Sequence, residues 1–470
     1  MKTLRKSLGL FITVAIISIP KALSSGILGI GTIILLCIGG CMVLSAIEAF
    51  LSYFSKKFYI NKGNLIFIHG IINRENTIVP LDRIHSLRTK MGVFYRLLDM
   101  RGIIFDTLAT KQEEIELILD EHDWQQLLSL IEKEENILRP STPNDPPEYD
   151  PTSTVHYPTK NLLLAALCQN HLKGMAALGS FFGIVFGNLS DLDENTTNSI
   201  ANHLEDFFDG IIASPPKIIL FLAIIYIVIL LLWIGRILLK YYDMTMSHSK
   251  KILTFTYGLI TRATNRFLHD KICTIRIKRN ILEKKFGFST IMLKQAVNVS
   301  AEKGKDVLNL YGFDNSSFFL KWWLGDDFGK FPHLITAKSG RGVFFHSILL
   351  PSLIAIAAAI IMAHFQMYIW IIIPLIYLLF SFVSGIYKMR RSRISLYSSY
   401  FIIHNGSLAE IENFVKYSSI EVVRIRRTPF TRWFHRVSLV ISTPGTTFLV
   451  RSIKEEEAKQ IYELLLDSIR

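Results

Sequence analysis

The sequence predicts an α+β membrane protein in which three transmembrane helical hairpins alternate with three small β-sandwich or barrel domains, each closed by a C-terminal helix. Three observations predict this class. Half of the 470 residues are apolar and the mean hydropathy is +0.34, which is typical of a membrane protein. One segment of more than thirty residues recurs three times without a gap. Apolar stretches long enough to cross a bilayer end in basic residues.

The repeat aligns on Gly70, Gly258 and Gly406. Apolar residues stand at the same distances from each glycine, in a spacing typical of short strands joined by tight turns. The aligned apolar sets are Leu65, Leu253 and Phe401; Phe67, Phe255 and Ile403; Ile84, Ile272 and Ile420; Leu87, Ile275 and Val423; and Ile103, Ile291 and Leu439.

Each repeat also carries a basic pair, 18 and 20 residues after its glycine. A strand alternates its faces with period two, so this pair shares the face opposite the apolar residue at position 17. We predict that the pairs form a surface for anionic lipid headgroups or a protein partner, and a solvated strand face is the alternative. The six candidate residues are Arg88, Lys90, Arg276, Lys278, Arg424 and Arg426.

Residues 1–55 are predicted as the first transmembrane hairpin. Leu8 to Ile19 is a short apolar stretch behind three basic residues, so residues 1–25 are either a span or a cleaved signal peptide. Gly26 to Leu51 is long enough to cross the bilayer. Lys56 and Lys57 follow it, which indicates that the next domain lies in the cytoplasm.

Residues 56–138 are predicted as the first domain. Its short apolar strands are followed by a helix from Trp124 to Glu135, with Trp124, Leu127, Leu128 and Ile131 on one face. Five prolines lie between Pro140 and Pro151, so residues 139–160 are predicted as an extended Pro-rich linker.

Residues 161–242 are predicted as the second hairpin. Its spans are Met175 to Leu189 and Pro216 to Leu239. The loop between them, Ser190 to Ser214, is acidic and has no Lys or Arg, which places it outside the cell membrane.

Residues 243–337 are predicted as a divergent second domain, whose closing helix, Ser316 to Leu324, is short and aromatic. We expect these aromatic residues to pack on a neighbour or to enter the membrane interface. Residues 338–392 are the third hairpin, with spans Val343 to Ala363 and Met367 to Tyr387. Residues 393–470 are the third domain, and a helix to Ile469 closes it.

The segment IVPLDRIHSLRTKMGVFYRLLDMRGIIFDT resembles the bacterial pleckstrin-homology-like (PH-like, or bPH) domain of the YdbS/YdbT membrane proteins. A Pro-Leu pair at Pro80 leads to Ile84 and a strand, a Leu-rich turn follows at Arg96, and Gly102 starts the next strand. The resemblance covers nearly the whole chain, although Phe267 and Leu268 replace the Pro-Leu pair in the second domain. It implies a seven-stranded barrel-like sandwich with a C-terminal helix, a bacterial inner-membrane location, no known catalysis and a small companion PH-like membrane protein as one partner.

The sequence favours a non-enzymatic role. It contains no HExxH, GxSxG or Walker A motif, and its histidines and cysteines lack metal-ligand spacing, so we predict neither cofactor nor metal. The formal charge of +13 is explained by basic residues at the cytoplasmic membrane surface, and no nucleic-acid motif competes with that reading.

We therefore predict a multi-pass membrane protein that presents three cytoplasmic PH-like domains for binding lipid headgroups or protein partners. Both termini are expected in the cytoplasm. A transporter or a transporter-associated subunit is the alternative, but no Asp, Glu or Lys stands at the centre of a predicted span, as carriers require.

Overall fold

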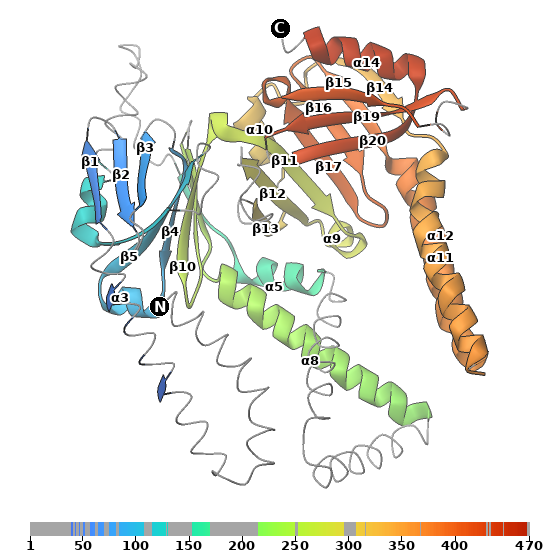
Figure 1. The fold of residues 1–470 in the computed structure, drawn as a ribbon, viewed down its shortest axis with the longest axis horizontal. Helices are drawn as coiled ribbons and strands as arrows, with labels where there is room; N and C mark the ends of the chain where they lie inside the picture. The colour runs from blue at the N-terminus through green and yellow to red at the C-terminus, as the bar shows by residue number, and fades with distance from the viewer. Residues whose placement is uncertain are drawn as a thin grey trace. The chain divides into compact units, whose positions relative to one another are not determined.

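Figure 1 shows the fold of the chain as a computed structural model. The structure describes residues 57–61, 64–69, 75–80, 84–107, 115–127, 153–169, 215–249, 252–295, 307–366 and 368–467, apart from single positions in the last two ranges, with isolated positions at 39–51 and at 129. The chain divides into two compact units, residues 1–82 with 170–236, and residues 83–169 with 237–470. Each unit is described by itself.

The third domain packs a four-stranded antiparallel layer on a three-stranded one. The first layer holds, in order, β14 (His333–Lys338), β15 (Arg393–Tyr397), β16 (Tyr400–Asn405) and β17 (Glu410–Lys416). The second holds β18 (Val422–Arg426), β19 (Arg436–Thr443) and β20 (Thr446–Lys454), and α14 (Glu455–Asp467) follows. Alternate residues of both layers point inward, so Phe401, Val415, Leu439 and Val450 are fully buried together with Ile461 of α14.

The second domain repeats this plan. Its first layer is β7 (Ser153–His156), β8 (Thr245–His248), β9 (Ile252–Tyr257) and β10 (Arg262–Leu268), and its second is β11 (Ile272–Arg279), β12 (Ser289–Gln295) and β13 (Val307–Phe313). Helices α5 (Thr159–Leu167), α9 (Ile281–Lys285) and α10 (Ser317–Leu324) accompany them. The aromatic helix α10 packs inward: Phe319 stacks on Phe255 with centroids 6.3 Å apart, and Trp323 is 1% exposed.

The first domain is divided between the two units. In the first unit β1 (Lys57–Asn61), β2 (Asn64–His69) and β3 (Glu75–Pro80) form an antiparallel sheet in that order. In the second unit lie β4 (Ile84–Met91), α3 (Val93–Leu97), β5 (Met100–Thr107) and β6 (Ile115–Asp120). Residues 121–127 are helical, and Trp124 and Leu127 are buried, as the sequence predicts for the closing helix.

Successive repeats share their sheets. One seven-stranded sheet runs β6-β5-β4-β10-β9-β8-β7, so it joins half of the first repeat to half of the second. Another runs β13-β12-β11-β17-β16-β15-β14 and joins the second repeat to the third (Figure 1). We call the pairing of two strands from successive repeats a joint. The first joint pairs β4 with β10, and the second pairs β11 with β17. Strands β4 and β11 carry the predicted basic pairs of their repeats.

The structure differs from two predicted boundaries. Residues 139–160 are predicted as a linker, but β7 lies within them and pairs with β8. The predicted second domain ends at residue 337, but β14 pairs with β15 and buries Ala337 in the third domain's core. The first strand of the second domain therefore precedes the described span α8 (Pro215–Tyr241), and that of the third domain precedes α11 (Gly342–His364) and α12 (Ile372–Arg391), while the other strands follow. Strands of four and six residues carry too little periodicity to reveal a partner beyond the spans.

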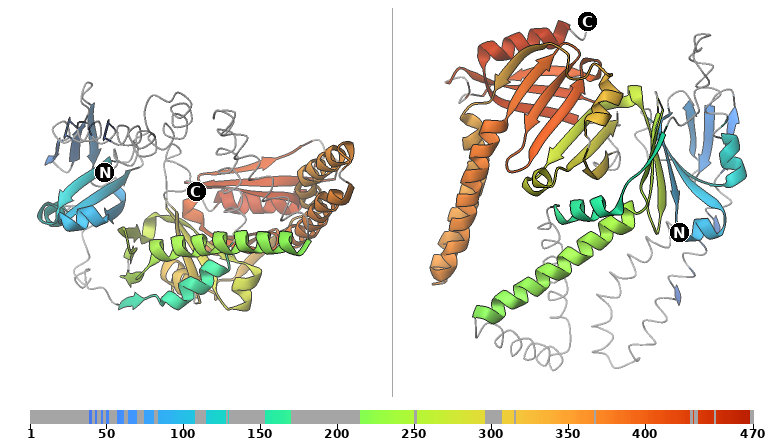
Figure 2. Two further views of the ribbon diagram at one scale, coloured as in Figure 1. Left: turned by 90° about the horizontal axis from the view of Figure 1, so that it is seen from below. Right: turned by 180° about the vertical axis from the view of Figure 1, so that it is seen from behind.

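Three described helices are long and apolar enough to cross a membrane, by length and composition: α8 (Pro215–Tyr241), α11 (Gly342–His364) and α12 (Ile372–Arg391). They match the predicted fourth, fifth and sixth spans. Helices α11 and α12 lie side by side in both views of Figure 2, with η3 (Tyr368–Ile371) at their turn. Gly385 permits close approach, because a Cβ there would lie 3.2 Å from Phe344 Cδ2.

These findings establish an α+β membrane protein. The predicted hairpin 1–55, apart from isolated positions, lies outside the described residues, as do the span Met175–Leu189, the acidic loop Ser190–Ser214 and most of the linker 139–160.

Candidate functional site

The candidate site is built on the three basic strands β4, β11 and β18. Strands β11 and β18 each follow a short 3-10 helix, η2 (His269–Lys271) and η4 (Tyr417–Ser419). In all three strands apolar residues alternate with polar ones, so that one face can be buried while the other carries the charges. The apolar face is seen in Ile275 at 0% exposure and Val423 at 8%. Each of the three strands pairs on one side with the next strand of its own repeat. The strands differ in what pairs with them on the other side.

Two joints between repeats use the same pairing. At the joint of β4 with β10, Arg88 lies opposite Asn265 and Lys90 opposite Ala263. At the joint of β11 with β17, Arg276 lies opposite Asn413 and Lys278 opposite Ile411. The predicted basic residues of the first two repeats are therefore placed at strand joints, and the asparagines opposite them were not predicted. They stand seven residues after Gly258 and Gly406, and the repeat alignment carries that signal.

Arg276 is partly buried and links the second domain to the third. Its Nε donates a hydrogen bond to Asn413 Oδ1 at 2.6 Å, and Asn413 Nδ2 donates to the Ile403 carbonyl at 3.0 Å. Asn413 is 0% exposed. Burial lowers the pKa of Arg276, as expected for a cation that is partly removed from water.

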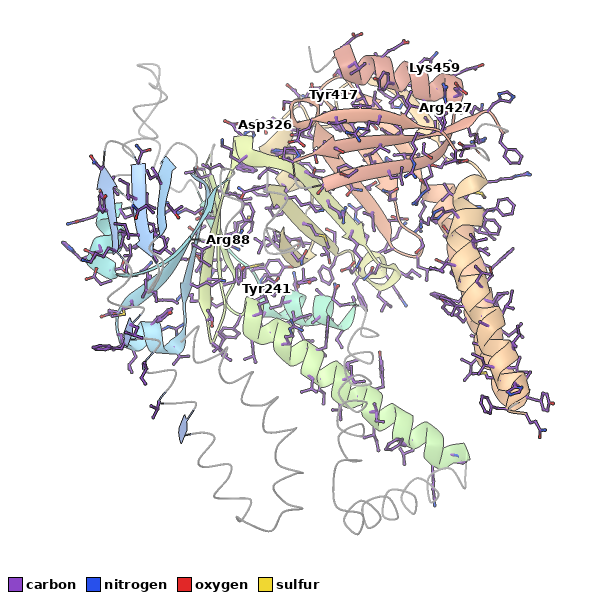
Figure 3. The ribbon with its side chains drawn as sticks, in the orientation of Figure 1. Arg88, Tyr241, Asp326, Tyr417, Arg427 and Lys459 are labelled. Atoms are coloured by element: carbon purple, nitrogen blue, oxygen red, sulfur yellow. The ribbon has the colours of Figure 1, made fainter. Side chains whose placement is uncertain are left out.

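Arg88 has a comparable setting on β4 (Figure 3). Opposite it, Asn265 Nδ2 donates to the Tyr257 hydroxyl at 2.8 Å. Burial raises the pKa of Tyr257, while the bond from Asn265 and the charge of Arg88 oppose that rise. Arg88 thus contributes to a polar cluster at the joint of β4 with β10.

Lys294 on β12 lies at the second joint and reaches the third domain. Its Nζ donates to Thr446 Oγ1 of β20 at 3.1 Å. Burial, and then the nearby charge of Arg276, lowers the pKa of Lys294 to about 8. Two cations are therefore held between these two domains.

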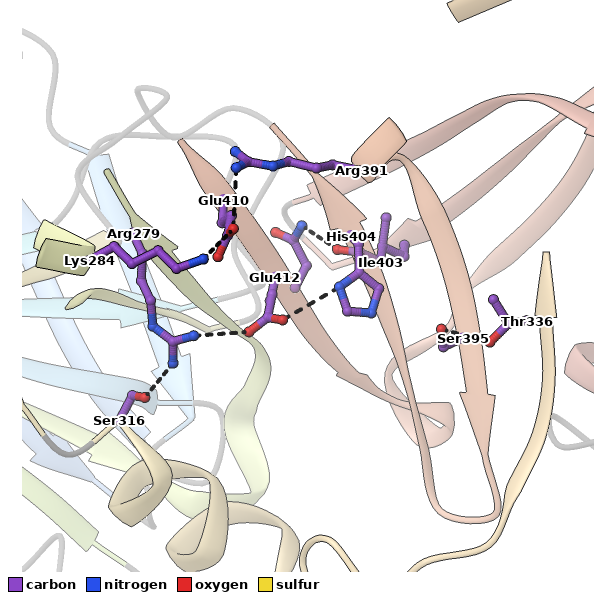
Figure 4. A network of polar contacts seen from close by, with 11 residues as sticks. Arg279, Lys284, Ser316, Thr336, Arg391, Ser395, Ile403, His404, Glu410 and Glu412 are labelled. Atoms are coloured by element: carbon purple, nitrogen blue, oxygen red, sulfur yellow. Dashed lines mark hydrogen bonds and ion pairs between the residues drawn. The ribbon is translucent and has the colours of Figure 1, made fainter. Parts of the chain in front are cut away.

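An ion-pair network on the same joint brings in α12 (Figure 4). Glu410 of β17 accepts from Lys284 Nζ at 3.0 Å and pairs with Arg391 at 3.2 Å. Arg391 is the last residue of α12 and also donates to the carbonyls of Ser407 and Leu408. The network therefore ties the second domain and the end of a membrane span to the third domain.

Glu412 forms the second half of this network. His404 Nδ1 lies 3.5 Å from Glu412 Oε1, and Arg279 lies 3.9 Å from Glu412 Oε2. Arg279 also donates to Ser316 Oγ at 3.1 Å. The hydrogen bond from His404 lowers the pKa of Glu412, against burial, which raises it.

Strand β18 has no such joint in the described part of the chain. It pairs with β19 alone, and Arg424 and Arg426 are exposed. The next residue, Arg427, is labelled in Figure 3. It forms an ion pair with Glu455 of α14. The structure thus separates the six predicted residues into four at joints and two on an open strand edge.

Within the described residues, no group of three or more His, Cys, Asp or Glu side chains could hold a metal ion. The arrangement seen is one of strand pairing and ion pairs between repeats. It defines a multi-pass membrane protein whose small β-domains are linked edge to edge.

The comparisons with known proteins identify these domains. The chain belongs to the Bacterial PH domain family, whose model matches residues 10–135, 204–313 and 345–469. The three matches follow the three repeats and confirm the resemblance drawn from the sequence.

One curated relative is the UPF0699 transmembrane protein YdbT of Bacillus subtilis (strain 168). It is 24% identical over an alignment of 256 positions, and the match covers 51% of this chain and 50% of the relative. The match therefore spans about half the length of the relative.

Proposed function

We propose that this protein is a non-enzymatic scaffold of the bacterial cytoplasmic membrane, which holds its PH-like domains on the cytoplasmic side and docks a protein partner on β18. One observation carries the proposal. The basic strands β4 and β11 are each taken into the sheet of the next domain, whereas β18 has β19 as its only strand neighbour among the described residues.

The orientation follows from charge. Helix α12 ends in Lys388, Arg390 and Arg391, directly before the third domain, and the loop predicted between the third and fourth spans is acidic. Basic residues collect on the cytoplasmic side of a membrane protein. The same rule places all three domains and both termini in the cytoplasm if three hairpins alternate with the domains.

An open strand edge is a docking surface because its outward N–H and C=O groups can form hydrogen bonds with a partner strand. Charged side chains on the edge discourage pairing with arbitrary strands. Arg424 and Arg426 therefore favour a partner strand that carries acidic or hydrogen-bond-accepting side chains. Since both internal joints connect PH-like domains, a partner with a PH-like edge strand fits best, including a small companion membrane protein.

Site-specific photo-crosslinking of the full chain in bacterial membranes tests this function. A photoreactive residue at position 424 should give a discrete crosslinked product, and the same residue in place of Lys459 on α14 should not. Proline at Ile425 and, separately, at Arg426, each in a chain that carries the photoreactive residue at position 424, refines the result, since successive N–H groups of a strand point to opposite sides. One of the two prolines removes an N–H that points away from β19. That variant should keep the thermal stability of the native chain but lose the crosslinked product. A chain that gives no product from position 424 would overturn the proposal.

Binding of anionic lipid is the second candidate, and the exposure of Arg424 and Arg426 favours it. Each basic side chain near an anionic leaflet is worth about 1 kcal/mol. Neutral Gln at both positions would abolish salt-sensitive binding to anionic vesicles but only weaken strand docking, which the main-chain hydrogen bonds of the edge would still support. Vesicle flotation of a soluble third domain distinguishes the two functions.

Transport has no comparable support. The three described spans, α8, α11 and α12, contain no Asp or Glu. A carrier of ions or protons usually places such groups within its spans.

A further inference from the structure

We infer that β18 of one copy pairs with β3 of a second copy of this chain, in the register that both internal joints share. The inference rests on the docking role proposed for β18 and names its partner. It makes the molecule self-complementary from end to end.

The register of the joints is the first argument. In both joints the residue 18 after one repeat glycine faces the residue 7 after the next repeat glycine, as with Arg88 and Asn265 and with Arg276 and Asn413. The residue at position 20 likewise faces the residue at position 5. A register that recurs at two joints with different side chains is a property of the repeat and applies to a third joint.

Strand β3 is the second argument. It holds the place in the first repeat that β10 and β17 hold in the later repeats, between 5 and 10 residues after the aligned glycine. The strands β10 and β17 each accept the basic strand of the preceding repeat. In its own unit, β3 has β2 as its single neighbour among the described strands. Among the described strands, no basic strand of another repeat pairs with β3, so this edge can accept one.

Exposure at β3 points the same way. Ile78 stands eight residues after Gly70, where the third repeat has Phe414. Phe414 lies at a joint, opposite Ile275, and is 5% exposed. Ile78 is 59% exposed. A strand docked at β3 would place an apolar residue beside Ile78, as β11 places Ile275 beside Phe414.

The shared register also matches the charges. It places Arg424 opposite Thr77, whose hydroxyl oxygen can accept a hydrogen bond as the amide of Asn413 does. It places Val423 opposite Ile78, an apolar pair, and Arg426 opposite Glu75, a pair of opposite charge. Because the two edges differ, the contact is head-to-tail, and it propagates as a ring or an open row of copies in the membrane plane.

Disulfide trapping between full-length copies tests the pairing. Two copies with different tags are expressed together in a background whose four cysteines are replaced by Ala or Ser. One copy carries Ile425→Cys and the other Asn76→Cys, which the register places opposite each other at a separation that a disulfide can span. We expect a disulfide that joins the two tags.

Two controls match this pair. Thr89→Cys with Thr264→Cys in one chain occupies the same register positions at the joint of β4 with β10 and should close within the chain. Tyr59→Cys, on the opposite edge strand β1, should not trap Ile425→Cys. A chain carrying both Ile425→Cys and Asn76→Cys that closes only on itself, with no bond between tags, would overturn the inference in favour of its own β3.

A charge exchange tests the register separately. Arg426→Glu or Glu75→Lys alone should lower the yield of trapped dimer about fivefold, the factor that corresponds to about 1 kcal/mol for a cross-strand ion pair. Both changes together should restore it, and Lys459→Glu on α14 should leave it unchanged. If position 424 crosslinks to a different protein and no disulfide joins the two tags, the pairing of β18 with β3 is refuted but the docking function of β18 stands. If position 424 gives no crosslink at all, both are refuted.

Discussion

Arg276 and Asn413 belong to different repeats, yet Arg276 Nε donates to Asn413 Oδ1 at 2.6 Å across the joint of β11 with β17. The asparagine is fully buried, and its Nδ2 donates a hydrogen bond to the Ile403 carbonyl. Neither side chain would have this partner in an isolated domain. The bond therefore makes the second and third domains interdependent.

Removing the acceptor should destabilise the protein strongly. Asn413→Leu leaves the partly buried Arg276 without this acceptor, and a buried polar group without a partner costs about 1–3 kcal/mol. Unfolding of the purified full chain in detergent measures the change. The double variant with Arg276→Met should recover part of the loss, because both polar groups are then gone. Strictly additive effects would contradict a direct interaction.

The stability of the joint should depend on pH through Lys294. Its folded pKa is about 8, below the ordinary 10.5, so the unfolded chain binds the extra proton between these values. Stability should therefore rise with pH from about 8 to 10.5. Lys294→Met should flatten this rise and add on the order of 1 kcal/mol at pH 7, after allowance for solvent screening. A steeper rise in the variant than in the native chain would refute the assignment.

Glu412 should make the stability of the protein depend on pH in the acidic range. Its folded pKa lies below the ordinary 4.5 because of the hydrogen bond from His404, so it stabilises the fold above that value. The contribution is lost as the pH falls below about 4.5 and the carboxylate is protonated in the folded state. Glu412→Gln should cost up to about 1 kcal/mol at neutral pH and little at pH 3. Glu463→Gln on α14 is the matched control. An equal effect of this substitution would show that the ion-pair network of Glu412 is not the cause of the pH dependence.

The repeat glycine should resist substitution. Gly406 has φ of +109°, and a Cβ there would collide with the Ala409 carbonyl oxygen. Gly406→Ala should therefore lower the free energy of unfolding by about 1–3 kcal/mol. Gly92→Ala has open space around its Cβ and no positive φ, so it should be nearly neutral. Melting temperatures of the two variants, compared in one detergent, decide the point.

The third domain should become soluble if its membrane hairpin is replaced by a turn. Lys338 of β14 and Arg393 of β15 are paired, and Ser339 N donates to the Ser392 carbonyl at 3.0 Å. Joining residues 330–338 to 393–470 through a short Asn-Gly turn keeps both strands. A fragment of residues 393–470 lacks β14, uncovers the edge of β15 and should aggregate. Equal solubility and melting of the two proteins would show that β14 is dispensable.

Much of the core was predictable from the repeat. The residues three and five before each aligned glycine are buried in every copy: Leu65, Phe67, Leu253, Phe255, Phe401 and Ile403. Period-two alternation also places the basic pair opposite the core. Local pattern carries this information because it depends only on which face of a strand meets its own domain.

The joints were not predictable in the same way. Whether Arg276 meets water, lipid or Asn413 depends on which strand pairs with β11 from outside its own domain, and that strand lies in another repeat. Nothing in the spacing around Arg276 differs from the spacing around Arg424, although one is at a joint and the other on an open edge. The asparagines at position 7 were the available signal, since the same amide recurs at this position in the second and third repeats.

The placement of β14 before and β15 after the α11–α12 hairpin bears on biogenesis. The ribosome releases β14 first, and this strand has no companion until both spans have entered the bilayer and β15 has emerged. Failed insertion would leave β15 on the wrong side of the membrane or too far away to pair. The sheet of the third domain can therefore be completed only after both spans have been inserted, so folding of this domain depends on correct insertion.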